Sequence, residues 1–508
     1  MARKSSTKGT SASRRSAVEA PDFFDHPNGE LVIGLVAAVG TDLELFERLL
    51  TRHLKTFGFN SNSIRLSHFL KVVDRRSIGV ELREGSEADR INSYMDAGDK
   101  LRELTGRNDI LALYAVSAIS QSRPDQQPAF VRKAHILRSL KHPDEVQTLR
   151  RIYGEGFYLI GVSSSEESQL NFLVKDQGIS EDEARALIRR DQQEASLFGQ
   201  QTRDAFHLAD VFINLHKNAT EDLWRFLDLL FGNPYISPTL DEQAMFIAYS
   251  SSLRSASLSR QVGAVVASQK GEIISVGAND VPSFGGGLYW PGENDQRDHV
   301  WEFDSNDRQR NEIVLDVIKR LKPTGVSLAS SDEELLREGK RLLAGSPLFD
   351  LTEYGRAVHA EMEALLSCSR SGVSPRNGTL YSTTFPCHNC AKHIVAAGIR
   401  RVVYVEPYPK SKAAELHGDS LSVEQEAPGK VLFEPFVGVA ARHYFNLFSI
   451  HLGSGYRLKR KEEGRVVSWK RSSARLRVAM LPTSYIDRER LAIRLMAQTV
   501  IRPEGGMP

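Results

Sequence analysis

Cysteine is scarce in this sequence, with three residues among 508. Three thiols cannot form the disulfide framework of a small secreted protein, which indicates a reducing compartment where thiols are free for metal binding or catalysis. Long apolar runs are lacking too, since the longest, residues 31–40, is far shorter than the roughly 20 residues of a membrane helix. The basic first residues are not followed by the apolar run of a secretory signal. We therefore expect a cytoplasmic protein without a membrane partner.

The rest of the composition is that of a folded protein. Hydrophobic residues make up 41% and charged residues 26% of the chain, which excludes a mainly disordered polypeptide. At roughly 100–200 residues per domain, the length predicts two to four domains.

Positive charge is concentrated near the two ends of the chain. Residues 1–20 carry a net charge of +4 and residues 457–477 carry +7, although the whole chain carries only +2. We expect a disordered basic tail at 1–24 and a basic extension at 457–508. Such segments either bind polyanions such as RNA or are simply solvated.

Strands and helices alternate in residues 25–233, which predicts a parallel sheet covered by helices. A buried strand at 31–39 precedes a helix for which Asp42 is the expected N-cap and Gly58 the residue just past the end. Further elements are expected, alternately helix and strand, at 142–154, 156–164, 180–191 and 207–215, with a last helix at 221–232. The turn-rich link that begins at Asn233 marks a boundary.

A second α/β domain is expected at 234–456. It opens with a helix at 242–257 and a hairpin of two apolar strands, 262–268 and 272–277. After a polar insertion at 284–350, helix and strand alternate again, and a last amphipathic helix is predicted at 435–448.

The strongest chemical motif is a histidine followed by two closely spaced cysteines. His359 precedes Glu361, and Cys387 and Cys390 lie three residues apart at the start of a predicted helix. One imidazole and two thiolates are good Zn²⁺ ligands and leave a fourth position for water. The i, i+3 spacing points both sulfur atoms to one side of the helix.

Glu361 lies beside this metal site without ligating it. The arrangement H-x-E followed by P-C-x-x-C is the signature of zinc-dependent nucleobase deaminases. In that chemistry zinc makes hydroxide available near neutral pH, and the glutamate moves a proton from water to the base and to the departing ammonia. A closed structural zinc site is the alternative. Cys368, in an apolar helical stretch, is expected to pack in the core.

Residues 241–450 resemble the deoxycytidylate deaminase group of the cytidine deaminase fold. Nearly the whole chain, about 25–500, resembles the bacterial anti-phage dCTP deaminases. The resemblance implies a P-loop-kinase-like parallel-sheet domain followed by an α/β/α cytidine-deaminase-fold domain. The matching stretches are RSASLSRQVGAVVAS, GEIISVGANDVP, HAEMEALLS and TLYSTTFPCHNCAKHIVAAGIRRVVYVEPYPKS, with LVIGLVAAVGTDL, TRDAFHLADVFI, RFLDLLFGNP and GGGLYWP supporting the longer match.

The resemblance also implies residues that bind the substrate. Asn279 occupies the family position that hydrogen-bonds the sugar, although an asparagine after a strand is also ordinary turn chemistry. The backbone N–H of Ala360 is expected to contact the pyrimidine. Sugar and phosphate contacts are expected from Arg254, Arg260, Tyr408 and Lys410.

The first predicted strand leads into a glycine-containing loop that departs from a working phosphate loop. Five residues separate Gly34 from Gly40, and Thr41 and Asp42 stand where the motif has Lys and Ser/Thr. Phosphoryl transfer is therefore not expected. The loop, with Gly34, Gly40 and Thr41, either binds a regulatory nucleotide through backbone N–H groups or serves only packing.

The function that the resemblance implies is hydrolytic deamination of dCTP, with dCMP left open as a further substrate, which would drain the dCTP pool during phage infection. The alternatives are a deaminase of single-stranded polynucleotides and a deaminase regulated by a small RNA on its basic tail. By resemblance we also expect a nucleotide effector and a homo-oligomer such as a hexamer. The insertion is either a lid or allosteric pocket or an ordinary surface excursion.

Overall fold

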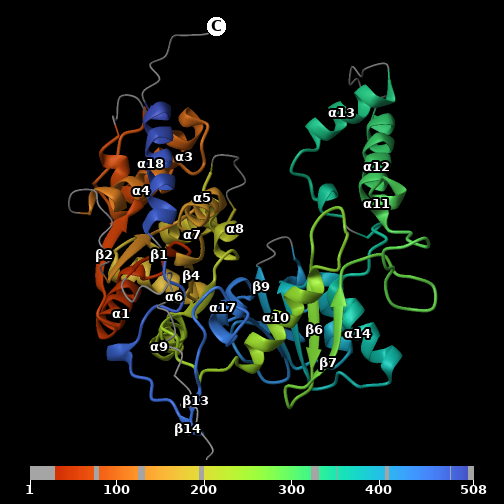
Figure 1. Ribbon diagram of the computed structural model, residues 1–508. Helices are drawn as coiled ribbons and strands as arrows, with labels where there is room; N and C mark the ends of the chain where they lie inside the picture. The colour runs from red at the N-terminus through yellow and green to blue at the C-terminus, as the bar shows by residue number, and fades with distance from the viewer. Residues whose placement is uncertain are drawn as a thin grey trace, which may run out of the picture.

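The chain forms two α/β bodies that lie side by side (Figure 1). The computed structural model describes residues 29–73, 79–123, 132–193, 199–321, 331–351, 353–406, 411–480 and 482–500. The expected tail at 1–24 lies outside these residues. None of the helices in the described part of the chain combines the length and the apolar character that crossing a bilayer requires.

The first body is built on a six-stranded sheet of order β12-β5-β4-β1-β3-β2. All neighbouring strands are parallel except β12, which pairs antiparallel with β5. The central strand β1 is buried along its whole length, as the apolar run in the sequence predicted. The strands are β1 (Glu30–Val36), β2 (Asn60–Arg65), β3 (Lys133–Arg138), β4 (Phe157–Ser163), β5 (Val211–Asn214) and β12 (Gly438–Val439).

Helices cover both faces of this sheet. The first, α1, begins where predicted: the Asp42 carboxylate accepts a hydrogen bond of 2.9 Å from the Leu45 N–H, and Gly58 takes a positive φ after the last turn. The polar strand β2 was not predicted. The helices are α1 (Leu43–Thr56), α3 (Glu87–Thr105), α4 (Ile110–Gln121), α5 (Pro143–Tyr153), α6 (Glu166–Asn171), α7 (Glu181–Gln193), α8 (Thr202–Phe206) and α9 (Ala219–Leu230).

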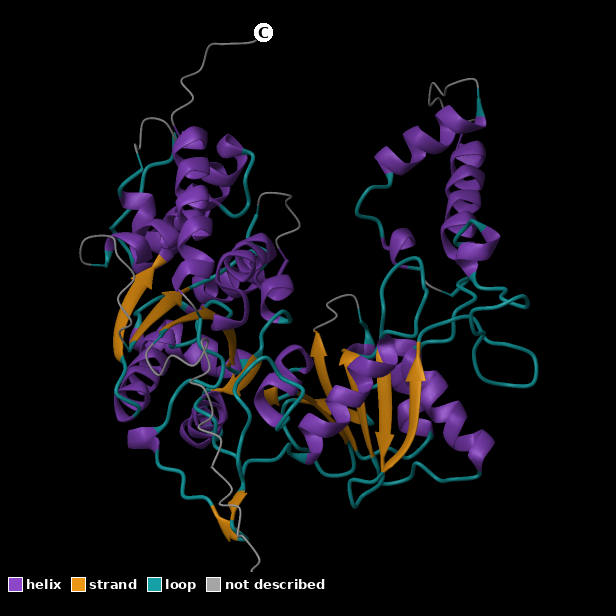
Figure 2. Ribbon diagram, in the orientation of Figure 1, coloured by secondary structure: helices purple, strands orange, loops and turns teal. Residues whose placement is uncertain are grey.

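The second body is a mixed sheet of order β10-β11-β9-β8-β6-β7 with helices packed on it (Figure 2). The predicted hairpin is present as the antiparallel pair β6 and β7, and β8 runs parallel to β9. The strands are β6 (Gly263–Ala267), β7 (Ile273–Ala278), β8 (Thr379–Thr384), β9 (Arg401–Glu406), β10 (Leu421–Val423) and β11 (Val431–Pro435). The helices are α10 (Leu240–Ser252), α14 (Ala360–Ser371), α15 (His388–Ala396) and α16 (Ala413–Leu416).

The insertion forms an arm that projects from the second body (Figure 1). Its helices are α11 (Asp298–Trp301), α12 (Ser305–Leu321) and α13 (Asp332–Leu342). A small apolar cluster, centred on Val314, Ile318 and Leu335, holds α12 against α13.

After the second sheet the chain returns to the first body. The prediction of one helix over 435–448 was wrong. This stretch instead supplies β12 to the first sheet, and only the short helix α17 (Tyr444–Phe448) follows. A two-stranded ribbon, β13 (Lys461–Glu462) and β14 (Arg465–Val466), leads to the last helix, α18 (Pro482–Val500). This helix packs on α4 and α5, so the basic extension belongs structurally to the first body.

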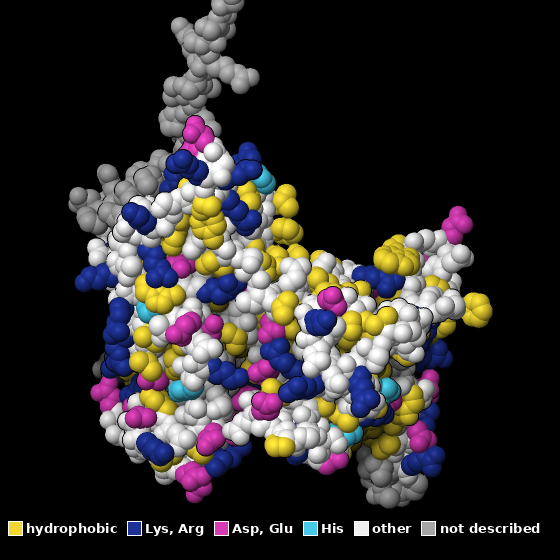
Figure 3. Space-filling model, turned by 90° about the horizontal axis from the view of Figure 1, so that it is seen from below, with side chains coloured by type: hydrophobic (Ala, Val, Ile, Leu, Met, Phe, Trp, Pro, Cys, Tyr) yellow, Lys and Arg dark blue, Asp and Glu magenta, His cyan; other side chains and the backbone are white. Residues whose placement is uncertain are grey.

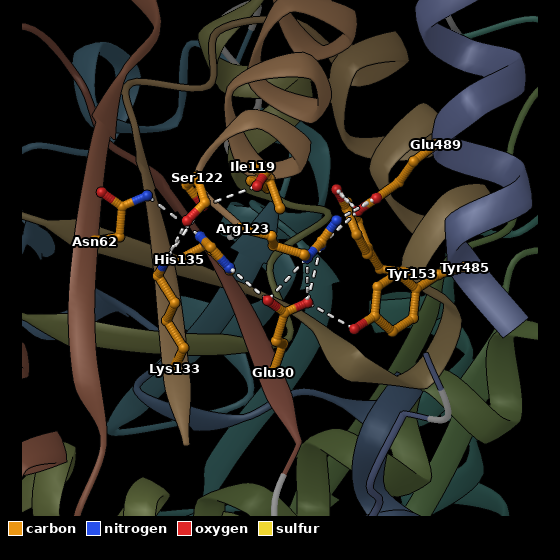
Figure 4. A network of polar contacts seen from close by, with 10 residues as sticks. All are labelled: Glu30, Asn62, Ile119, Ser122, Arg123, Lys133, His135, Tyr153, Tyr485 and Glu489. Carbon is orange, nitrogen blue, oxygen red and sulfur yellow. Dashed lines mark hydrogen bonds and ion pairs between the residues drawn. The ribbon is translucent and has the colours of Figure 1, made fainter. Parts of the chain in front are cut away.

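A buried ionic network fixes α18 in place (Figure 4). The Arg123 guanidinium donates to both Glu30 oxygens at 3.0 Å and to Glu489 on α18 at 2.6 and 2.9 Å. Tyr153 donates to Glu489 and Tyr485 donates to Glu30. Burial on its own raises the pKa of Glu30, but hydrogen bonds from His135, Arg123 and Tyr485 outweigh it and lower this pKa to about 2.

Glu489→Ala should release α18 from the first body, because it leaves the Arg123 charge buried without half of its partners. Loss of one member of a buried pair costs about 3–5 kcal/mol. Hydrogen exchange of the α18 amides measures the effect, and faster exchange is expected. The matched control is Arg490→Ala, which removes an exposed ion pair with Asp487 and should leave exchange unchanged. Equal protection in the two variants would contradict the anchoring role.

Candidate active site

His359 lies at the N-cap of α14, which packs directly on β7. The close approach depends on Gly277 in β7. A Cβ atom at this position would come within 2.1 Å of the Ala360 carbonyl oxygen and 2.5 Å of the Ala364 nitrogen. The missing side chain therefore sets where the first turn of α14, and with it His359, lies in the second body.

Cys387 is the N-cap of a second helix, α15, and Cys390 follows in its first turn. The Cys387 sulfur accepts a hydrogen bond of 3.4 Å from the Cys390 backbone N–H. The helix follows β8 after a short loop, so the strand and the helix start together fix both sulfur atoms. A thiolate at a helix N-terminus is stabilised by the helix dipole.

The two helix starts bring the three predicted ligands together. The His359 Nδ1 atom lies 3.3 Å from the sulfur of Cys387 and 3.3 Å from that of Cys390. Ligand atoms around a tetrahedral zinc ion, with Zn–N of about 2.0 Å and Zn–S of about 2.3 Å, are separated by about 3.5 Å. The group therefore fits a zinc ion with a small expansion, and it is the one cluster of this kind found among the described residues.

Hydrogen bonding between these side chains favours the ligand form of Cys387. Its bonds with Cys390 and His359 lower the pKa of the Cys387 thiol to about 4, against the opposing effect of burial. The bond with Cys387 in turn raises the pKa of His359 to about 9, and the pKa of Cys390 is raised as well, first by its bond with Cys387 and then by burial. Metal binding would therefore displace protons from these two side chains. A thiolate is the form of cysteine that binds metal.

Glu361 points into the same site from the first turn of α14. Its carboxylate lies 3.4 Å from the Cys390 sulfur, and only 3% of the residue is exposed. Burial raises the pKa of this carboxyl group. A buried carboxyl group beside a metal site and open to a cavity is suited to proton transfer.

A cavity of about 390 Å³ opens over His359 and Glu361. Three residues of the predicted substrate set line it, namely Asn279, Ala360 and Arg260. Ala360 is the first residue of α14, so its N–H has no acceptor within the helix. The Asn279 amide is engaged with the protein: its oxygen accepts from the Val262 N–H at 2.6 Å and its nitrogen donates to the Arg260 carbonyl at 2.8 Å. Asn279 thus holds the cavity wall in shape.

Arg254, also in the predicted substrate set, is not among the residues that line this cavity. Arg254 donates to the carbonyl oxygens of Leu288 and Tyr289 and lies 3.9 Å from the Trp290 ring centre, so it fastens the base of the insertion. Tyr408 and Lys410 lie outside the described residues.

The sequence did not single out the side of the cavity that the insertion supplies. Asp298, Asp304, Asn306 and Arg310 of the insertion line this side, and Arg356, just after the insertion, also lines the cavity. The only signal was the density of charged residues around 292–311, which does not tell a cavity wall from a solvated surface.

The three residues predicted for a regulatory nucleotide lie in the first body. Gly34 is in the middle of β1, where a Cβ atom would come within 2.5 Å of Leu140, so it serves strand packing. Gly40 has a φ of +86° in the loop after β1, and Thr41 follows it. Gly34 thus has a role in strand packing, whereas Gly40 and Thr41 lie in the loop between β1 and α1.

Comparisons with known proteins found relatives of the second body. Residues 238–406 match the cytidine and deoxycytidylate deaminase zinc-binding region. The deoxycytidylate deaminase of Enterobacteria phage T2 is 36% identical over 166 residues, which are 33% of this chain and 79% of the phage protein. That of phage T4 is 34% identical over 166 residues, 33% of this chain and 77% of the phage protein. The apo dCMP deaminase of cyanophage S-TIM5 aligns with 40% of this chain and 100% of its own, at 19% identity and a TM-score of 0.22.

The matched zinc-binding region contains His359, Cys387 and Cys390, and these residues form a group that could hold a metal ion. The geometric fit and the family match agree on the metal, so the predicted zinc cofactor is confirmed.

Cys387→Ser should lower the zinc content of the purified protein, because a serine hydroxyl is a far poorer zinc ligand than a thiolate. Metal analysis of the full chain measures this. The control is Cys368→Ser on α14, whose sulfur lies 3.1 Å from the Ser275 hydroxyl and outside the metal group. Unchanged zinc in Cys387→Ser would refute this ligand.

Proposed function

The chain belongs to the deoxycytidylate deaminase family, and from this premise we propose that its second body converts a deoxycytidine nucleotide to the deoxyuridine nucleotide with release of ammonia. The observation that carries the proposal is the position of Glu361. Its buried carboxylate lies beside the zinc-binding group and on the wall of a cavity that is large enough for a small ligand.

Each residue of the site has a separate role in the proposed reaction. Bound zinc supplies the Lewis acidity that lowers the pKa of water. Glu361 accepts a proton from the attacking water and delivers it to the ring nitrogen and then to the departing amine. Water adds to the carbon that bears the exocyclic amine, and the bond from that carbon to nitrogen breaks. The Ala360 N–H, free of helix bonding, is placed to hold the pyrimidine.

Glu361→Gln should keep the shape of the site and its zinc but lose ammonia release by about 10²–10⁴-fold, because the amide cannot accept the proton. The control is Glu363→Gln. Glu363 lies two residues further along α14, pairs with Arg370 and does not line the cavity. The assay measures ammonia from dCMP, dCTP, CTP, dATP and a cytosine-containing single strand, with and without dTTP or dGTP. Near-normal turnover by Glu361→Gln would refute the proton shuttle.

We propose dCTP as the preferred substrate, because several cations stand at the outer part of the cavity. Arg260, Arg310 and Arg356 all line it, and a triphosphate needs several cationic donors. The acids among them are engaged, since Asp298 pairs with Arg356 at 2.8 Å and Asp304 accepts backbone N–H groups at the start of α12. Arg310 pairs with Asp307 and Arg260 with Glu406, so a bound triphosphate would have to compete with these carboxylates for the arginines.

Arg310→Gln should raise the KM for dCTP about tenfold or more, because a charge-assisted hydrogen bond to phosphate is lost. The KM for deoxycytidine, which has no phosphate, should not change. Arg308→Gln is the matched control: it removes the same charge from α12, but Arg308 is exposed and pairs with Glu312 outside the cavity. Equal effects of both variants on dCTP would contradict a specific phosphate contact.

Depletion of dCTP would starve phage DNA synthesis, and we propose this as the cellular role that the resemblance implies. The alternatives of a polynucleotide substrate and a regulatory RNA gain less support. Arg460 and Arg477 of the basic extension bind backbone carbonyls, and Arg471 pairs with Asp228 at 2.7 Å. On the face seen in Figure 3, basic and acidic side chains are interspersed.

We further propose that residues 25–233 form a regulatory, P-loop-kinase-like domain and that the deaminase lies within the predicted range 234–456, of which the last part, from β12 on, joins the first body. The parallel order of β1 to β5 and the β1–α1 loop support the first assignment. Homo-oligomerisation, the nucleotide effector and the cytoplasmic location stay predictions from the sequence.

A further inference from the structure

A second cavity, of about 400 Å³, lies in the first body at the edge where β1, β2 and β3 end. Residues 37–44, which join β1 to α1, form one side of it. The opposite sides come from the ends of β2 and β3 and from α3. Open parallel sheets bind their ligands outside the carboxyl ends of the strands, because loops and helix N-termini converge there.

Arginines dominate the charge of this cavity. Arg65 ends β2, Arg138 ends β3, Arg90 comes from α3 and Arg48 from α1. The four come from segments far apart in the sequence, and no motif predicted that they would meet.

Three of these arginines are neutralised by acids and one is not. Arg48 pairs with Glu44, Arg90 with Glu87, and Arg138 with Glu47. The half-buried Arg65 guanidinium has no hydrogen bond or ion pair with any residue that the structure describes. Burial, and then the charges of Arg138 and Arg90, lower the pKa of Arg65, and the charges of Glu44 and Glu47 only partly oppose this shift. The surroundings of Arg65 therefore disfavour its cation on balance, and an anion bound in the cavity would stabilise it.

The hydroxyl of Thr41 gives a second, independent indication of a ligand. Thr41 is only 8% exposed and lines the cavity just before α1. Its Oγ1 atom is buried and has no partner among the described residues. Buried hydroxyl groups are almost always hydrogen-bonded, so a group of this kind facing a cavity marks a place where a ligand atom binds.

One side of the cavity is apolar. Ile91, Phe172 and Leu173 line it beyond the cationic part. The volume is within the range of small-molecule sites. The cavity therefore offers donors for an anionic group and an apolar surface for an attached ring.

We propose that this cavity binds a small phosphate-bearing molecule, with Arg65 and Thr41 donating to its phosphate oxygens. Phosphoryl transfer is not part of the proposal, because the nearest lysine, Lys141, is held at 3.0 Å by both Asp191 and the Ala37 carbonyl. The site is separate from the deaminase cavity and does not depend on the reaction proposed there.

Calorimetric titration of the full chain carrying Glu361→Gln tests the proposal without turnover. The probes are inorganic tripolyphosphate, dATP and dGTP, so that a bare polyphosphate is distinguished from a nucleotide. Arg65→Gln should weaken binding of at least one probe about tenfold or more. The matched control is Arg52→Gln on the exposed side of α1, outside the cavity, which should bind as the parent does. Arg310→Gln should also leave this binding intact, which separates it from the deaminase cavity.

Thr41→Val supplies a second test that does not depend on the arginine. The change removes a buried hydroxyl without a protein partner, so the variant should unfold no earlier than the parent and yet bind the same probe more weakly. Three results would overturn the proposal: no binding of any probe, binding that Arg65→Gln leaves unchanged, and binding that only Arg310→Gln abolishes. Binding of a single-stranded oligonucleotide alone would overturn it as well.

Discussion

The catalytic body depends on one constraint, the meeting of two helix N-termini at a single point. His359 begins α14 and Cys387 begins α15, so each ligand is fixed by the end of a rigid element. Backbone contact between α14 and β7 at Gly277 sets one helix, and the β8 strand sets the other. A shift that moved either helix an ångström away from the other would take the ligand atoms from 3.3 Å to well beyond the separation of about 3.5 Å that a tetrahedral zinc site requires. The position of β8, the glycine at 277 and the starts of the two helices thus all determine the geometry of the metal ligands.

A buried carboxylate connects this body to the first one. Glu242, 1% exposed, caps α10 by accepting the Thr239 N–H, and it also accepts the Val439 N–H of β12 at 3.0 Å and the Arg225 guanidinium of α9 at 2.5 Å. The helix that packs on β6 therefore shares one side chain with the sheet of the first body. Burial of this charge with all its partners couples the positions of the two sheets, since loss of any partner leaves the carboxylate desolvated and undersatisfied.

The sequence was sufficient to predict those features that are determined by residues close together in the chain. The metal group was predictable because its spacing and its helix-start context lie within two short segments, and the N-cap at Asp42 was predictable for the same reason. The strand β12 was missed because its identity depends on β5, more than two hundred residues earlier, and an apolar stretch with an aromatic face favours a helix when it is read alone. Arg310 and Arg65 were missed because an arginine in a cavity wall and one in water look the same in a sequence.

Each body has a cavity beside a helix start, with arginines supplied by distant segments. In the second body Arg310 comes from the insertion, and Arg260 and Arg356 come from segments before and after it. In the first body the arginines come from α1, from the ends of β2 and β3, and from α3. If a ligand in the first cavity changes the affinity of the second for its nucleotide, reciprocity requires the nucleotide to change the affinity of the first by the same factor. The described contacts offer a physical route for such coupling, because α1 packs on α9, α9 holds Glu242, and Glu242 caps the helix that supports β6. A rigid junction of this kind transmits a shift at the β1–α1 loop only if α9 and α10 move together, which is what their shared buried carboxylate enforces.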